Sequence, residues 1–172
     1  MIRIGVLTVS DRSARGERED RSGPLLAELA GRLPGAVIEE QAIVPDDAAA
    51  LQSILRRWAD DLHLDLILTT GGTGFASRDV TPEATLAVVD RLAPGFAEAM
   101  RGASLQITPH AMLSRAVAGI RGQTLMVNMP GSPRSVRENF AVIAPALPHA
   151  VQLLQDAPDA EAHHHFHGAQ VA

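Results

Sequence analysis

The feature that most constrains the fold is the stretch at residues 64–74, where a short apolar run ends abruptly in a turn rich in threonine and glycine. The run is too short for a helix and predicts a buried strand of a parallel sheet. Three glycines within residues 71–74 permit positive φ angles and leave successive N–H groups exposed. Thr81-Pro82 predicts a helix start with Thr81 as the N-cap. This strand, turn and helix suit a phosphate site, although these residues alone also fit an ordinary connection.

The segments on either side follow the pattern of an α/β protein. Strands are predicted at residues 2–10, 36–44 and 64–70, with helices between them at about 22–33 and 45–62. Apolar runs at 116–120 and 124–128 flank a turn that contains glycine and predict a hairpin. The sequence therefore predicts a three-layer α/β/α sandwich around a mostly parallel, Rossmann-like sheet with one antiparallel strand. Further helices are predicted at 82–92, at 94–104, and at 133–154 with a kink at Pro145.

Composition limits the class of protein. The chain has 172 residues, which suits a single domain, predicted at residues 1–155. Its net charge of −5 argues against nucleic acid or an anionic membrane surface as a partner. It has no cysteine, which excludes a disulfide framework, an iron–sulfur cluster and a thiolate zinc site. No apolar run approaches 18 residues and the first ten residues lack a signal-peptide layout, so a cytoplasmic location is expected.

The C-terminal segment differs in composition from the rest. Residues 156–172 are rich in alanine, aspartate, proline and histidine, which predicts a disordered His-rich tail. The cluster at residues 163–167 has the donors to bind a divalent metal, but a solvated tail is the favoured interpretation.

Candidate site residues follow the strands at their carboxyl ends, where ligands gather in parallel sheets. Ser10-Asp11, Asp46 and residues 71–79 all follow predicted strands, so we expect them to share one edge of the sheet. A second turn, Pro130-Gly131-Ser132-Pro133, repeats the first, with Ser132 as the predicted N-cap. Two such turns facing each other would bind two anionic groups, such as the phosphates of a nucleotide and of a second substrate.

Three carboxylates are candidates for Mg²⁺ binding, since this ion is usually held by one or two carboxylates plus substrate oxygens. Asp79 is the strongest, because Thr81 is expected to cap the following helix in its place. Asp46 has a structural alternative as a helix N-cap, a role that Asp47 fits equally well. Asp11 has the alternative of a local ion pair with its neighbour. No activated nucleophile is evident, since no Gly-x-Ser-x-Gly elbow is present.

Seven motifs in order carry a family resemblance: Val9-Ser10-Asp11, Val44-Pro45-Asp46-Asp47, Thr70-Gly71-Gly72-Thr73-Gly74, Arg78-Asp79-Val80-Thr81-Pro82-Glu83-Ala84-Thr85, Pro94-Gly95-Phe96, Met112-Leu113-Ser114-Arg115 and Asn128-Met129-Pro130-Gly131-Ser132-Pro133. The chain resembles the MogA/MoaB family of molybdenum-cofactor biosynthesis proteins, which includes the G domains of plant and animal homologues such as gephyrin. The resemblance covers residues 2–155.

The resemblance implies a homotrimer that binds molybdopterin and adenylylates it with Mg²⁺ and ATP, releasing pyrophosphate and passing its product to a molybdenum insertase. It assigns metal binding and catalysis to Asp46 and Asp79. It assigns ligand binding to a longer set: Ser10, Asp11, Gly71, Gly72, Thr73, Gly74, Ser114, Pro130, Gly131 and Ser132.

One departure keeps an alternative open. The segment after Pro130–Pro133 is short, as in MoaB-like members, some of which bind the pterin without catalysing adenylylation. Phosphoryl-type transfer needs positioning and charge neutralisation rather than a protein nucleophile. Arg12, Arg78, Arg115 and Arg134 are the expected counter-charges. Because of the short segment after Pro130–Pro133, a catalytically silent molybdopterin-binding protein remains the alternative function.

Overall fold

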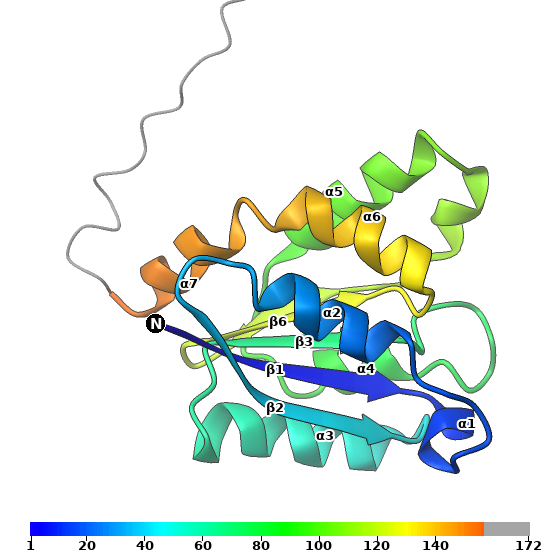
Figure 1. Ribbon diagram of the computed structural model, residues 1–172, viewed down its shortest axis with the longest axis horizontal. Coiled ribbons are helices and arrows are strands. Elements are labelled where there is room, and N and C mark those ends of the chain that lie inside the picture. The colour runs from blue at the N-terminus through cyan, green and yellow to red at the C-terminus, as the bar shows by residue number, and fades with distance from the viewer. Residues whose placement is uncertain (157–172) are drawn as a thin grey trace, which may run out of the picture.

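A mixed six-stranded sheet forms the centre of the protein (Figure 1). The computed structural model describes residues 1–156. The strands follow the spatial order β2-β1-β3-β6-β5-β4. Their bounds are β1 (Ile2–Val9), β2 (Ala36–Val44), β3 (Leu66–Thr70), β4 (Arg91–Leu92), β5 (Ala118–Arg121) and β6 (Thr124–Met129). Only β5 runs against the others, because it pairs antiparallel with both β4 and β6. The predicted sheet with one antiparallel strand is confirmed.

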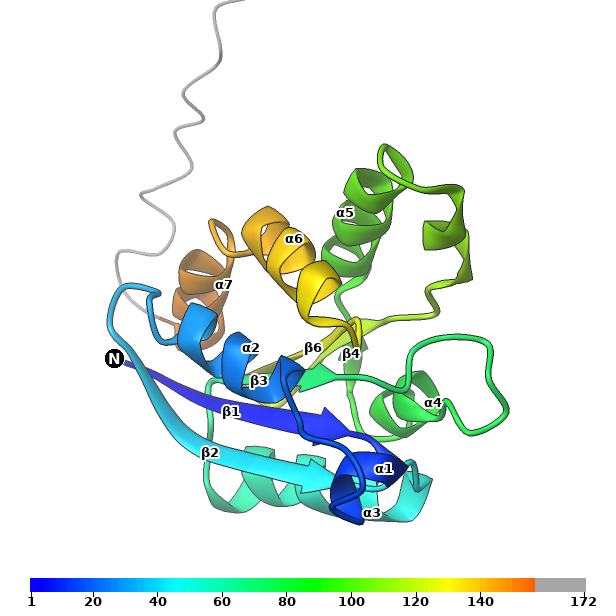
Figure 2. The same ribbon diagram turned by 45° about the vertical axis from the view of Figure 1, so that its right-hand side comes forward.

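Helices cover both faces of this sheet and make the predicted three layers (Figures 1 and 2). One face carries α2 (Ser22–Ala30), α5 (Pro94–Leu105), α6 (Pro133–Ile143) and α7 (Leu147–Leu154). The other face carries α3 (Ala48–Arg56), continued by the π-helical turn η1 (Arg57–Asp61), and α4 (Thr81–Leu86). The short elements α1 (Asp11–Ala14) and η2 (Pro109–Leu113) complete the fold. None of the helices within residues 1–156 has the length and apolar character needed to cross a membrane.

Central and edge strands differ in burial, as their patterns predict. All five residues of β3 are buried, because helices cover both of its faces. Leu66 and Leu68 face the layer that contains α2 and α6, whereas Ile67 faces the layer of α3, where it packs with the fully buried Trp58. In β2, at the sheet edge, half-buried and exposed residues alternate. The short apolar run that ends at Thr70 therefore correctly predicts a buried strand of the parallel sheet.

Two predicted helices are wrong in extent. The helix expected at residues 82–92 ends at Leu86, and Arg91–Leu92 instead form the edge strand β4, with Asp90 N donating to Ile120 O at 2.8 Å. The helix expected at 133–154 is not merely kinked but divided into α6 and α7. Pro145 lies in the break, where it lacks the N–H that a continuous helix requires.

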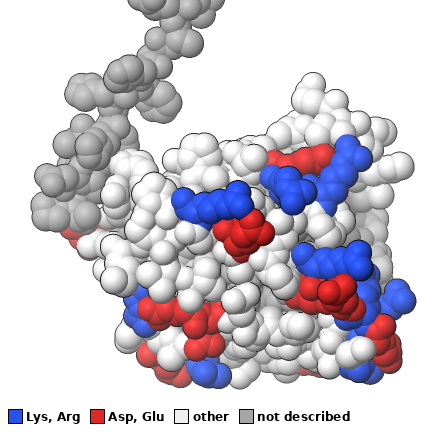
Figure 3. All heavy atoms as spheres, in the orientation of Figure 1, with Lys and Arg blue, Asp and Glu red and all other residues white. Residues whose placement is uncertain are grey.

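The expectation of a disordered tail falls almost entirely outside the described residues, which end at Asp156. The hypothesis that residues 163–167 bind a metal falls outside them as well. On the face shown in Figure 3, basic residues lie beside acidic ones and do not form a continuous basic surface.

Candidate functional site

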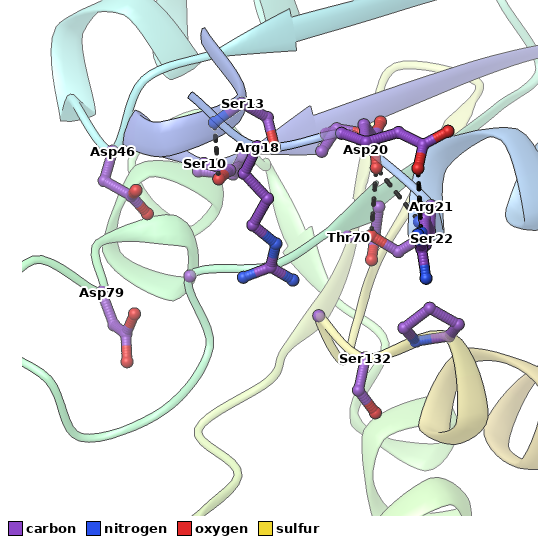
Figure 4. A pocket seen from close by; sticks show the side chains of 17 residues that line it. Ser10, Ser13, Arg18, Asp20, Arg21, Ser22, Asp46, Thr70, Asp79 and Ser132 are labelled. Carbon is purple, nitrogen blue, oxygen red and sulfur yellow. Dashed lines mark hydrogen bonds and ion pairs between the residues drawn. The ribbon is translucent and has the colours of Figure 1, made fainter. Parts of the chain in front are cut away.

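A cavity of about 720 Å³ opens where the carboxyl ends of β1, β3 and β6 meet (Figure 4). Figure 2 shows the loop that follows β3 at the same end of the sheet as α1. Seven residues singled out from the sequence line this cavity: Ser10, Asp46, Gly71, Gly72, Asp79, Gly131 and Ser132. They come from four separate segments of the chain. Parallel strand pairing brings these segments to one edge.

The two glycine turns contact each other at the floor of the cavity. Thr70 Oγ1 donates to Pro130 O at 2.7 Å, which links the end of β3 to the turn after β6. Gly71 and Gly72 have φ angles of +100° and +64°, a region that favours glycine. A Cβ on Gly131 would lie 3.1 Å from Gly71 Cα, and a Cβ on Gly71 would lie 2.3 Å from Val9 O, so glycine at both positions permits this close approach. The sequence-based expectation that the turns face each other therefore agrees with this geometry.

Ser132 fulfils its predicted role and Thr81 does not. Ser132 accepts a hydrogen bond from Ser135 N and caps α6. Thr81 is instead the first residue of α4, whose N-cap is Val80 with no side-chain cap. The Thr81 hydroxyl donates to Gly71 O at 2.9 Å, and its N–H donates to Gly72 O. Thr81 thus stabilises the glycine turn through two hydrogen bonds to its carbonyl groups.

Asp46 does not have the capping role that the sequence left open. Asp47 caps α3 by accepting a hydrogen bond from Ala50 N at 2.8 Å. Asp46 and Asp11 instead exchange hydrogen bonds: Asp46 Oδ2 accepts from Asp11 N at 2.8 Å, and Asp11 Oδ1 accepts from Asp46 N at 3.0 Å. This exchange joins the loops after β1 and β2 and places the half-buried Asp46 in the cavity.

Electrostatic conditions differ between these two carboxyl groups. Burial raises the pKa of Asp46, and the nearby negative charges of Asp11 and Asp79 also raise it. The hydrogen bond from Asp11 N lowers this pKa, but the net shift is upward. Burial also opposes ionisation of Asp11, but hydrogen bonds from Arg78 and Asp46 N outweigh it and lower the Asp11 pKa. Asp46 and Asp79, which lie on the same side of the cavity in Figure 4, therefore repel each other, as two carboxylates do where a cation can bind between them.

Asp79 ends the loop that follows the glycine turn. Its Oδ2 accepts a hydrogen bond from Ala76 N at 3.0 Å, and its N–H donates to Ala76 O. A Cβ on Gly74 would come within 2.9 Å of Asp79 Oδ2, so glycine at this position leaves room for the carboxylate. Within residues 1–156, no group of three or more His, Asp or Glu side chains is arranged to hold a metal. Any cation bound by Asp46 and Asp79 would need oxygens from a substrate.

Several predicted binding residues lie outside this cavity. Ser114 and Pro130 line a neighbouring cavity of about 240 Å³ between α5, η2 and α6. Thr73 is buried, and its carbonyl accepts a hydrogen bond from Arg115 N at 2.9 Å. Gly74 O accepts from Arg115 Nε at 2.7 Å. Thr73 and Gly74 therefore hold the loop in place, and Asp11 positions Asp46.

The predicted counter-charges are mostly engaged elsewhere. Arg78 forms two hydrogen bonds of 2.9 Å with Asp11. Arg115 pairs with Glu83, and Arg134 pairs with Glu138 at 2.8 Å. Neither these three arginines nor Arg12 lines the cavity. Spacing in the sequence does not reveal which carboxylate a long side chain will meet.

Residues 13–21, which the sequence predicts to be a polar loop, begin within α1 and also contribute to the site. Arg18 and Asp20 from this segment line the cavity, together with Thr8 of β1 and Ser22 of α2. Asp20 accepts hydrogen bonds from Ser22 N and Gly23 N at the start of α2 and from Thr8 Oγ1 at 2.6 Å. An aspartate two residues before Ser-Gly-Pro is a recognisable cap signal and was available in the sequence.

The raised pKa of Asp46 gives a testable dependence of stability on pH. The folded state holds the Asp46 proton more tightly than the unfolded chain does. This group's contribution to stability is therefore full below the ordinary aspartate pKa and is lost as pH rises through the raised folded value. Asp46→Asn keeps an oxygen for Asp11 N and cannot ionise. We expect its free energy of unfolding at neutral pH to equal or exceed that of the unmodified protein, with the gain disappearing at about pH 3.

Asp47→Ala is the matched variant, because it removes the cap of α3 without touching the cavity. It should lower the free energy of unfolding by about 1 kcal/mol at both pH values. Urea titration of both variants measures the difference. A clear loss of stability in Asp46→Asn at neutral pH would contradict the interpretation of Asp46 as an ionised, repelled carboxylate.

Known proteins are similar to this chain in sequence. Residues 5–149 match the family described as "Probable molybdopterin binding domain". The chain is 44% identical over 154 residues to the molybdopterin adenylyltransferase of Helicobacter pylori strain J99, covering 89% of this chain and 88% of that protein. It is 41% identical over 167 residues to the molybdopterin adenylyltransferase of Escherichia coli K12, covering 90% and 86%. It is 46% identical over 164 residues to gephyrin of Dictyostelium discoideum, of which it spans 23%.

Solved structures share the fold. The molybdopterin biosynthesis enzyme MoaB of Thermus thermophilus superposes with a TM-score of 0.86 at 49% identity, covering 91% of this chain and 98% of that one. The molybdopterin biosynthesis Mog protein of Mycobacterium ulcerans gives a TM-score of 0.83 at 39% identity, covering 90% and 99%.

Proposed function

We propose that this chain, which belongs to the molybdopterin-binding domain family, is a molybdopterin adenylyltransferase of molybdenum-cofactor biosynthesis. Its substrates are ATP and molybdopterin, and its products are adenylyl-molybdopterin and pyrophosphate. The observation that carries the proposal is the contact of two glycine turns in one cavity beside Asp46 and Asp79. The relatives of similar length described above, from Helicobacter pylori and Escherichia coli, carry the same activity in their names.

The proposed reaction joins two anionic molecules. An oxygen of the terminal phosphate of molybdopterin forms a bond to the α-phosphorus of ATP, and the bond from that phosphorus to the bridging oxygen breaks. Pyrophosphate leaves with the electron pair. The protein contributes binding and orientation in such a reaction, and no side-chain nucleophile is required. The N–H groups of Gly72, Gly131 and Ser132 are available for phosphate oxygens, whereas Gly71 N already donates to Met129 O at 3.4 Å.

Mg²⁺ fits the carboxylates of this cavity. The charge of Asp79 opposes the ionisation of Asp46, and a cation between the two carboxylates would remove that opposition. Two carboxylates also match the way Mg²⁺ is commonly bound, with the remaining positions filled by water and substrate phosphates. When bound, the ion neutralises phosphate charge and orients the reacting groups. Asp46 and Asp79 are the residues that we propose as its ligands.

A catalytically silent molybdopterin-binding protein is the second candidate. What favours it is the short segment after Pro130–Pro133, a feature that the chain shares with MoaB-like members; MoaB of Thermus thermophilus is 49% identical over 91% of the chain. Incubation with molybdopterin, ATP and Mg²⁺ separates the two. We expect one pyrophosphate to be released for each adenylyl-molybdopterin formed, and release to depend on both substrates. Tight binding of molybdopterin without pyrophosphate release would favour the silent binder.

A homotrimer is part of the same proposal, following the family resemblance. Large apolar side chains are exposed on the loop after β3 and around η2, among them Phe75, Ile107 and Met112. Light scattering at micromolar concentration should give about three times the chain mass of 18.2 kDa, and a value equal to one chain would exclude it. We also propose a cytoplasmic location, where ATP is supplied, and transfer of the product to an enzyme that inserts molybdenum.

A further inference from the structure

The loop between α1 and α2 places a positive charge inside the main cavity. Arg18 lines the cavity, and Figure 4 shows its guanidinium group between Asp46 and Asp79 on one side and Ser132 on the other. This is the space in which the phosphates of two substrates would meet if the glycine turns bind them.

Hydrogen bonds anchor this loop at both ends. At its start, Gly16 N donates to Ser13 O and Glu17 N donates to Arg12 O at 2.9 Å. At its end, Asp20 accepts from Thr8 Oγ1 at 2.6 Å and from the first N–H groups of α2. Arg18 lies between these two fixed points. Its position over the cavity therefore follows from the loop and not from contacts of its own side chain.

Arg18 has no hydrogen-bond or ion-pair partner among the described residues, although several charged groups line the same cavity. Among the described residues that line the cavity there are two cations, and Arg21 is paired with Glu19 at 3.0 Å. Arg18 forms no hydrogen bond or ion pair with any residue between 1 and 156. Four carboxylates line the same cavity: Glu19, Asp20, Asp46 and Asp79. The acidic groups outnumber the cations, so the binding of two phosphate-bearing substrates needs an unneutralised cation in addition to a metal ion.

We propose that Arg18 binds the phosphates of the nucleotide and neutralises the charge that forms on the departing pyrophosphate. This inference rests on the proposed function for its substrate. As the bond between the α-phosphorus and the bridging oxygen breaks, negative charge moves onto the leaving group. A guanidinium contact there becomes stronger in the transition state than in the bound substrate. The planar guanidinium also donates two parallel hydrogen bonds to phosphate, which an ammonium group cannot do.

The test compares Arg18→Ala and Arg18→Lys with Arg15→Ala. Arg15 lies on the same loop, is paired with Glu17 at 2.7 Å and does not line the cavity. Isothermal titration measures affinity for inorganic pyrophosphate and for adenosine in the presence of Mg²⁺. Steady-state kinetics with ATP and molybdopterin measure kcat and KM. We expect Arg18→Ala to weaken pyrophosphate binding by about tenfold or more and to lower kcat by about 10- to 100-fold.

The same proposal predicts that Arg18→Ala binds adenosine normally, since adenosine has no phosphate. Arg18→Lys should fall between Arg18→Ala and the unmodified protein, which Arg15→Ala should resemble. Normal pyrophosphate affinity and kcat in Arg18→Ala, with active unmodified protein, would overturn the role of Arg18 and leave the proposed function intact. Equal loss of adenosine and pyrophosphate binding would also overturn it. If the unmodified protein binds pyrophosphate through Arg18 but transfers no adenylyl group, the proposed function fails and the phosphate site stands.

Discussion

Asp79→Asn is expected to lower the rate of adenylyl transfer by about 100-fold or more, while affinity for molybdopterin changes by no more than a few-fold. Asparagine keeps the shape of the side chain and loses the charge that would hold Mg²⁺ against the phosphates. The contribution of that charge grows as electrons move toward pyrophosphate in the transition state. Pyrophosphate release and equilibrium binding of molybdopterin measure the two effects separately.

The fold should survive this substitution. Asp79 does not cap α4, and an asparagine oxygen can still accept the hydrogen bond from Ala76 N. Asp90→Asn is the matched control, because Asp90 also accepts a hydrogen bond from a backbone N–H, that of Gly122, at a position outside the cavity. It should keep normal turnover. Near-normal adenylylation by Asp79→Asn would refute the metal role, and equal losses of binding and turnover would instead place Asp79 among the molybdopterin contacts.

Gly71→Ala is expected to have the largest effect on stability. Gly71 has a φ of +100°, and a Cβ added there would lie 2.3 Å from Val9 O. Val9 O is a backbone atom at the end of β1, so moving it would disturb the hydrogen bonding of the sheet. Backbone strain and collision together should lower the free energy of unfolding by about 3 kcal/mol or more. The single tryptophan, Trp58, is fully buried and reports unfolding by its fluorescence during urea titration.

Gly16→Ala separates strain from collision. Gly16 also has a positive φ, +71°, but a Cβ there would have nothing within 4 Å. It should cost only about 1 kcal/mol, the penalty of a left-handed conformation for alanine. If both variants lose the same stability, the contact between the glycine turn and Val9 does not determine the result.

Local sequence signals identified the elements that form the cavity. The apolar run in residues 64–74 specifies a strand because its side chains are buried. The glycines that follow specify a bend because glycine readily adopts positive φ angles. The alternation of strands and helices then placed Ser10, Asp46 and Gly71 at one edge. These residues do line one cavity, because the carboxyl ends of parallel strands meet.

Signals that depend on distant partners were misleading. Arg91 and Leu92 continued the helical pattern of residues 82–92, but their backbone pairs with Gly119 and Ile120 to extend the sheet. Thr81 has the residue type and position of an N-cap, yet its hydroxyl donates to Gly71 O, ten residues earlier in the chain. In both cases a tertiary hydrogen bond replaced the local one that the sequence predicted.

The sequence by itself determined the α/β layers, the two glycine turns and the carboxylates Asp46 and Asp79, since hydrophobic periodicity and glycine chemistry act over a few residues. Only the tertiary structure decided which charges remain available. Arg78 is paired with Asp11, and Asp20 accepts hydrogen bonds from the first N–H groups of α2. Arg18 lies in the cavity without a partner among the described residues. Long charged side chains pair with the groups that the fold brings close to them. The pairing of the strands determines which loops, and therefore which of these groups, lie close together.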